Sequence, residues 1–155
     1  ELFNQQNDDY QACLELLNTA IRDFPSNSYF YVVRSIVHLA LKQYERAQND
    51  IIQAVTCDPS WPRTNPVQKQ GVVRKVGELN RMLKKRWFVL KQYFLFYFEV
   101  STSRETLPKG VILLPEATLI QHRARRNHKH IEIITPRRSY FLKCASPQEG
   151  EEWLD

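Results

Sequence analysis

The stretch that decides the fold is GVVRKVGELNRMLKKRWFVLKQYFLFYFE, which spans residues 71–99. Three runs in it are rich in β-branched and aromatic residues, at 71–76, 85–90 and 93–98. Such residues favour the pleated, half-buried surface of a β-sheet. The stretch therefore predicts three consecutive strands, with a polar loop that carries a few apolar residues between the first two.

Four more short apolar runs follow, each bounded by turn residues. They lie at 110–114, 117–122, 130–134 and 139–144. Short strands separated by frequent turn signals are typical of an antiparallel barrel or sandwich. The chain then reads Ser146-Pro147-Gln148-Glu149, which predicts a helix with a serine cap and a proline in its first turn. Trp153 and Leu154 are expected on the buried face of that helix.

Residues 1–61 follow a helical pattern instead. Tyr10 recurs as Tyr44 after a period of 34 residues. The matching pairs that follow are Cys13 and Ala47, Leu17 and Ile51, Ala20 and Ala54, and Pro25 and Pro59. This period is typical of the tetratricopeptide repeat (TPR), although a generic helical hairpin with coincidental spacing is the alternative.

The repeat predicts about three TPR-like helices, near 5–24, 26–40 and 44–58, with Ser26 or Ser28 capping the second. Arg34 and His38 depart from the repeat, because they stand where it usually has a leucine and an aromatic residue. Two prolines within 62–68 predict a linker. The helical segment is expected either to contact a protein partner or to support its neighbour.

The balance of charged residues also changes near the predicted linker. Residues 1–66 hold five Lys and Arg against eight Asp and Glu, whereas residues 67–155 hold 17 against nine. The basic second part predicts an anionic partner. Three scattered cysteines without a CxxC pair suggest reduced thiols in a cytoplasmic compartment. No apolar run approaches the ~18 residues of a membrane span.

Seven strands and a helix, with KRWFVL in the second strand and a tryptophan in the helix, resemble the pleckstrin homology (PH) domain over residues 69–155. The implied fold class is α+β: antiparallel N-terminal helices, then a seven-stranded barrel or sandwich capped by a C-terminal helix. The run YFLFYFE is similar to cytohesin-type PH domains, which bind phosphatidylinositol trisphosphate. Those domains have a long hairpin between strands six and seven, and here only residues 135–138 lie there, which leaves the preferred head group open.

The candidate site consists of cations on the first two strands. Lys84 and Arg86 are two residues apart and share one face of their strand, and a hairpin would bring Lys75 beside them. Convergent ammonium and guanidinium groups suit the adjacent phosphates of an inositol ring. The spacing Lys75-x8-Lys84-x-Arg86 also matches the phosphoinositide-binding signature of PH domains, and the resemblance implies further phosphate contacts from Tyr97 and Lys109.

Two other groups of residues could assist at a membrane. Leu79, Met82 and Leu83 lie in the first loop, where they would either insert into the bilayer interface or pack under the mouth of the barrel. Additional cations would add nonspecific attraction to an anionic surface. These auxiliary residues are Arg74, Arg104, Arg123, Arg125 and Arg126.

The sequence thus predicts a membrane-recruitment adaptor that binds phosphoinositide head groups, including 3-phosphorylated ones. It would be cytoplasmic and recruited peripherally to the plasma membrane or endosomes. The alternative is a module whose PH fold binds a protein such as a small GTPase, with only weak binding to anionic lipid. No catalytic motif, metal site or cofactor motif is apparent, so neither an enzyme nor a cofactor is expected. No RNA-binding strand signature is present, so nucleic acid is not an expected partner.

Overall fold

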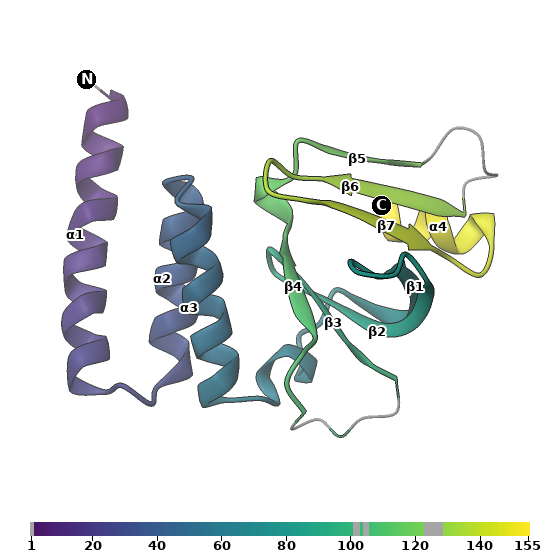
Figure 1. Cartoon of the computed structure of the whole chain (residues 1–155). Helices are drawn as coiled ribbons and strands as arrows, with labels where there is room; N and C mark the ends of the chain where they lie inside the picture. Colours follow the sequence, from purple (N-terminus) through teal and green to yellow (C-terminus); the bar gives the residue numbers. More distant parts are fainter. Residues whose placement is uncertain (1, 101–102, 104–105, 123–128) are drawn as a thin grey trace. The chain divides into compact units, whose positions relative to one another are not determined.

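The computed structural model describes residues 2–100, 103, 106–122 and 129–155 (Figure 1). The chain divides into two compact units, Glu1–Trp61 and Pro62–Asp155. Among the described residues, no helix is long and apolar enough to span a bilayer.

The first unit consists of the three expected helices, α1 (Leu2–Asp23), α2 (Ser28–Ala40) and α3 (Tyr44–Cys57). The expected cap of α2 is corrected by one position. Asn27 has extended backbone angles, and its side-chain oxygen accepts a hydrogen bond from the Tyr29 amide at 3.1 Å. Ser28 is already the first helical residue, so Asn27 holds the capping position.

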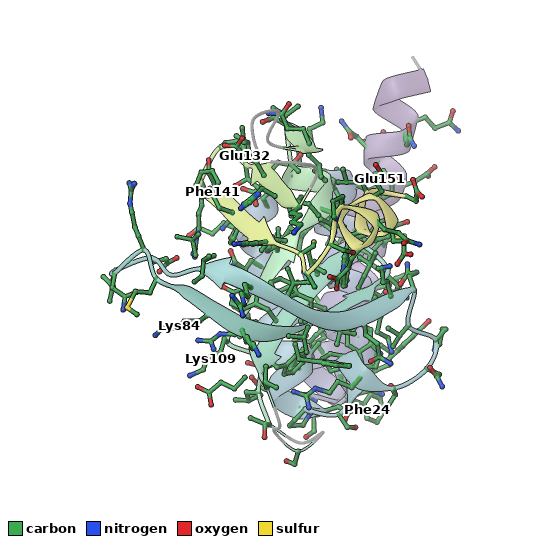
Figure 2. All side chains as sticks on the ribbon, turned by 90° about the vertical axis from the view of Figure 1, so that its right-hand side faces the viewer. Phe24, Lys84, Lys109, Glu132, Phe141 and Glu151 are labelled. Carbon is green, nitrogen blue, oxygen red and sulfur yellow. The ribbon has the colours of Figure 1, made fainter. Side chains whose placement is uncertain are left out.

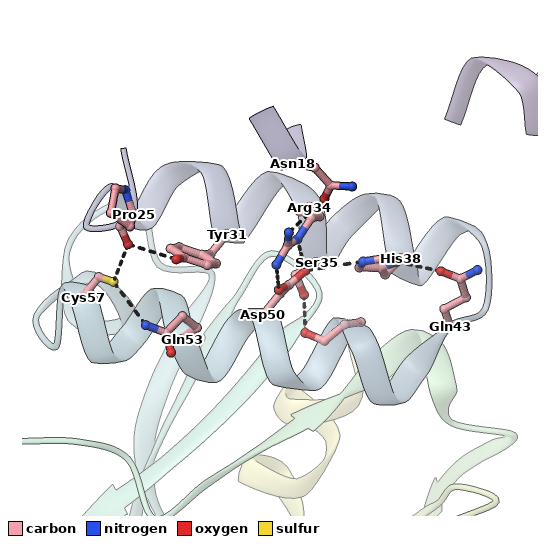
Figure 3. Close-up of polar contacts among 11 residues, drawn as sticks. Asn18, Pro25, Tyr31, Arg34, Ser35, His38, Gln43, Asp50, Gln53 and Cys57 are labelled. Carbon is pink, nitrogen blue, oxygen red and sulfur yellow. Dashed lines mark hydrogen bonds and ion pairs between the residues drawn. The ribbon is translucent and has the colours of Figure 1, made fainter. Parts of the chain in front are cut away.

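Polar contacts between α2 and α3 account for the two departures from the repeat pattern (Figure 3). Arg34 donates to both carboxylate oxygens of Asp50, at 2.8 and 2.7 Å. His38 pairs with the Gln43 side chain at 2.7 Å. The fully buried Ser35 donates to the Ala47 carbonyl oxygen at 2.7 Å, which draws the two helices together. Arg34 and His38 thus replace apolar contacts with a satisfied polar network.

The second unit is a seven-stranded antiparallel sheet followed by a helix. Its strands are β1 (Lys69–Val76), β2 (Leu83–Lys91), β3 (Phe94–Glu99), β4 (Gly110–Leu113), β5 (Leu119–His122), β6 (His130–Ile134) and β7 (Ser139–Lys143). The helix is α4 (Pro147–Leu154), and short 3-10 turns occupy Trp61–Arg63 and Leu114–Glu116.

The second of those turns shortens two predicted strands. Pro115 lies in its first turn and lacks the amide hydrogen that a strand would use, so β4 ends at Leu113 and β5 begins only at Leu119. The predicted cap of α4 is confirmed, because the Ser146 hydroxyl accepts from the Glu149 amide at 3.1 Å.

The sheet has the strand order β4-β3-β2-β1-β7-β6-β5 and encloses one apolar core. Val73, Phe88 and Leu95 from one half of the sheet pack with Ile131 and Leu142 from the other half. Trp153 of α4 contacts this core and meets Phe88 edge-on. The PH-like sandwich and its capping helix are therefore confirmed. Residues that share the face of Val73 and Phe88 point into the sandwich or toward its open end.

Candidate functional site

The register of β1 and β2 gathers three of the predicted cations on one face. Lys75 lies opposite Lys84, and Val73 lies opposite Arg86. Directly opposed residues of an antiparallel pair share a face, so Lys84, Arg86 and Lys75 lie on the same face as the core residue Val73. Among the described residues, neither Lys84 nor Arg86 forms an ion pair with a carboxylate. Within the described part of the chain, the hairpin thus holds three neighbouring cations without a direct carboxylate ion pair.

Lys75 is the most enclosed of these cations. Its residue is only 7% exposed, and its ammonium nitrogen lies 4.9 Å from the ring centre of Tyr97 and 5.9 Å from that of Tyr140. It donates to the Val76 carbonyl oxygen at 3.2 Å. Burial, followed by the charges of Arg138 and Arg86, lowers the pKa of Lys75 from 10.5 to about 8. An anion at this site would offset the cost of burying the Lys75 charge and would reduce its repulsion from the two arginines.

Tyr97 lines the same site from β3. It lies opposite Phe88 on β2 and opposite Gly110 on β4. Burial raises the pKa of Tyr97 to about 12, so its hydroxyl stays protonated and is available as a hydrogen-bond donor. A methyl group on Gly110 would lie 2.2 Å from the phenol oxygen, so glycine at this position leaves room for the ring.

Lys109 precedes β4 and is paired with an acidic residue that the sequence did not suggest. Its ammonium group lies 2.8 Å from Glu99, and Glu99 stands directly opposite Arg86. Lys109, Arg86 and Lys84 all lower the pKa of the Glu99 carboxyl, with Lys109 having the largest effect. Figure 2 shows Lys84 and Lys109 on the same side of the β1–β2 hairpin. The structure therefore places Lys109, together with the carboxylate of Glu99, at the edge of the cation group formed by Lys75, Lys84 and Arg86.

Arg138, from the turn between β6 and β7, is a further cation that sequence reasoning missed. Its guanidinium carbon lies 4.5 Å from the ring centre of Tyr140, and its charge contributes to the lowered pKa of Lys75. It is also ion-paired with Glu78 of the β1–β2 loop. The neighbouring Arg137 pairs instead with the buried Glu116. The adjacent Arg137 and Arg138 before β7 indicate a basic turn in the sequence, but the sequence does not show which arginine faces the site.

Of the predicted membrane-inserting residues, Leu79 and Met82 lie in the loop between β1 and β2, whereas Leu83 is the first residue of β2. Leu79 is fully exposed, Met82 is 63% exposed and Leu83 is 42% exposed. The loop is closed by a hydrogen bond from the Gly77 amide to the Met82 carbonyl oxygen at 3.0 Å. Large apolar side chains are therefore presented to solvent next to the cations.

Of the auxiliary cations, the structure describes only Arg74, and Arg74 does not join the site. Arg74 lies opposite Lys85, on the face of β1 and β2 that points away from Val73. Arg104, Arg123, Arg125 and Arg126 lie outside the described residues.

Comparison with known proteins decides the family. The PH domain family model matches residues 67–155. The chain belongs to the PH domain family. The chain is also similar to the RAC family serine/threonine-protein kinase homolog of Dictyostelium discoideum, at 34% identity over 93 residues, covering 59% of this chain and 20% of the relative.

A second relative matches a shorter part of the chain. The small glutamine-rich tetratricopeptide repeat-containing protein 2 of Saccharomyces cerevisiae is 35% identical over 57 residues, or 37% of this chain and 16% of the relative. The chain therefore spans a fifth or less of the length of these two curated relatives.

A solved structure resembles the second unit. It is a crystal structure of the C-terminal PH domain of pleckstrin in complex with D-myo-Ins(1,2,3,5,6)P5, with 30% sequence identity and a TM-score of 0.52. The match covers 59% of this chain and 91% of that chain. The PH fold of this unit thus resembles a domain that was solved in complex with an inositol phosphate.

Proposed function

We propose that the second unit binds the phosphorylated inositol head group of a membrane phosphoinositide, including 3-phosphorylated forms. The observation that carries the proposal is the arrangement of Lys75, Lys84 and Arg86 on one face of the β1–β2 hairpin. Like charges directly opposite each other, such as Lys75 and Lys84, destabilise a sheet. A bound polyanion would remove that cost and form short, charge-assisted hydrogen bonds.

Each side chain has a distinct role in this proposal. Lys84 and Arg86 supply the exposed and half-buried cations that meet the phosphates first. Lys75 contacts the head group from below, because it is buried between Tyr97 and Tyr140. Tyr97 and Lys109 add a neutral donor and a peripheral cation. The inositol phosphate complex of the pleckstrin PH domain supports this ligand class.

Membrane attachment would combine this site with the adjacent loop. The exposed Leu79, Met82 and Leu83 would enter the bilayer interface while the cations hold the head group. Burial of each apolar side chain would contribute about 1–2 kcal/mol, and each nearby cation about 1 kcal/mol against anionic lipid. We infer a cytoplasmic adaptor that is recruited peripherally to the plasma membrane or to endosomal membranes.

Successive side chains of β1 and β2 point to opposite faces of the sheet, so cations on the two faces can be removed in matched variants. The double variant Lys84→Ala/Arg86→Ala removes two cations from the site, and Arg74→Ala/Lys85→Ala removes two from the opposite face. Binding to liposomes that contain phosphatidylinositol trisphosphate is expected to fall at least tenfold in the first variant and about twofold in the second. Equal losses would indicate a nonspecific basic surface. That result would favour a protein ligand, such as a small GTPase, for the PH fold.

We propose that the first unit is a TPR-like segment that contacts a protein partner or supports the chain. The period of 34 residues, the antiparallel α2–α3 pair and the yeast tetratricopeptide relative support this assignment. Affinity capture with the full chain should recover a partner that is lost in a charge-reversal variant of α1 or α3. A partner that still binds after residues 1–61 are removed would place the contact in the other unit.

A further inference from the structure

Two acidic side chains stand among the cations of the candidate site. Glu99 contacts Lys109 at 2.8 Å, and Glu78 is ion-paired with Arg138. These pairs involve the two cations that lie at the edges of the group. Lys75, Lys84 and Arg86, at its centre, have no ion-paired carboxylate among the described residues. The central cations are therefore available to a ligand, while the peripheral ones are already engaged.

The pairing of β3 with β2 fixes the position of Glu99 beside these cations. It is the last residue of β3, and its Cα is registered with Arg86 on β2. Its carboxyl has a lowered pKa because of Lys109, Arg86 and Lys84, so it is ionised at neutral pH. A phosphate that approached Lys109 would meet this negative charge. It would either displace the carboxylate from Lys109 or remain close to it.

The charge balance indicates which head groups this arrangement suits. A phosphate monoester carries about −1.5 to −2 at neutral pH, so two adjacent phosphates carry about −3 to −4. The three central cations nearly balance a pair of phosphates. Each additional phosphate must reach toward Lys109 or Arg138. There the carboxylate of Glu99 or Glu78 already neutralises the cation and would repel the phosphate.

We propose that Glu99 is a selectivity residue that limits the gain in affinity from phosphates beyond two adjacent ones. This inference rests on the proposed function, because it assigns a preference to the same site. Glu99 acts by occupying Lys109 and by repelling a phosphate at the β3–β4 side. Removal of its charge should therefore favour highly phosphorylated ligands more than a bisphosphate.

The test compares two soluble ligands, inositol 3,4-bisphosphate and inositol 1,3,4,5-tetrakisphosphate, by calorimetry on the full chain. Glu99→Gln is expected to raise the ratio of tetrakisphosphate to bisphosphate affinity about fivefold, the effect of one nearby charge near a solvated surface. Glu132→Gln is the matched control. It removes the same charge from β6, on the face opposite the inward-pointing Ile131 and Ile133 (Figure 2).

The outcomes separate the two proposals. An unchanged ratio in Glu99→Gln, or an equal rise in Glu132→Gln, would overturn the role of Glu99 while wild-type binding upholds the site. Failure of the wild-type chain to bind either ligand would overturn both. The Glu99 side chain is 53% exposed, so the variant should fold normally, and an unchanged thermal midpoint would verify this. The rise in the affinity ratio caused by Glu99→Gln should also become smaller as ionic strength increases.

Discussion

Gly110 faces Tyr97 across the β3–β4 ladder so closely that a methyl group on Gly110 would fall 2.2 Å from the phenol oxygen. The glycine is thus needed for the position of a site residue. Gly110→Ala should force the buried ring aside, cost about 1–3 kcal/mol of stability and weaken inositol phosphate binding. Gly71→Ala is the control, because its methyl group would lie 3.8 Å from Trp153, an ordinary contact. Similar losses of stability in the two variants, measured by chemical denaturation, would contradict this role.

Lys75 should make ligand binding depend on pH. Its pKa is about 8 in the folded chain and 10.5 ordinarily. Phosphate prefers the protonated amine, so affinity should fall as pH rises through 8. We expect a loss of about three- to tenfold between about pH 7 and about pH 9, measured by calorimetry. Lys75→Arg keeps its charge and should show little of this loss. An equal decline in both proteins would assign the titration to another group.

The same shift has a consequence for stability. Between about pH 8 and 10.5 the unfolded chain retains the Lys75 proton that the folded chain has released. The unfolded state therefore binds more protons, and the contribution of Lys75 to the free energy of unfolding rises with pH across this interval. The rise should be smaller in Lys75→Met than in the wild-type chain.

The loop residues should matter for bilayers and not for soluble ligands. Leu79→Ser/Met82→Ser removes two exposed apolar side chains and is expected to weaken liposome binding about tenfold or more. The affinity for a soluble inositol phosphate should stay the same, because the cations are retained. Leu16→Ser, which removes a leucine that is 74% exposed on α1, is the control and should leave liposome binding unchanged. A parallel fall in both affinities of the loop variant would exclude insertion.

Much of the sheet could be predicted because its determinants are local. The alternation in β2 separates Lys84 and Arg86 from Lys85, and the hairpin places Lys75 opposite Lys84. What escaped prediction depends on contacts between distant segments. The ion pair of Glu78 and Arg138 joins two turns, and no local pattern encodes it. The cap at Asn27 escaped for a different reason, since three neighbouring residues, 26–28, all have capping side chains and only the backbone angles distinguish them.

Adjacent arginines in the β6–β7 turn should have separable effects. Arg138→Gln leaves the Glu78 carboxylate without its ion-pair partner beside the site. The repulsion between this carboxylate and phosphate should lower inositol phosphate affinity about three- to tenfold with little change in stability. Arg137→Gln should lower stability with little change in inositol phosphate affinity. It leaves Glu116, which is 5% exposed, without the guanidinium that contacts it at 2.7 Å, at a cost of about 1–3 kcal/mol. Thermal unfolding and calorimetry on both variants would test this, and loss of binding in Arg137→Gln without loss of stability would contradict the assignment.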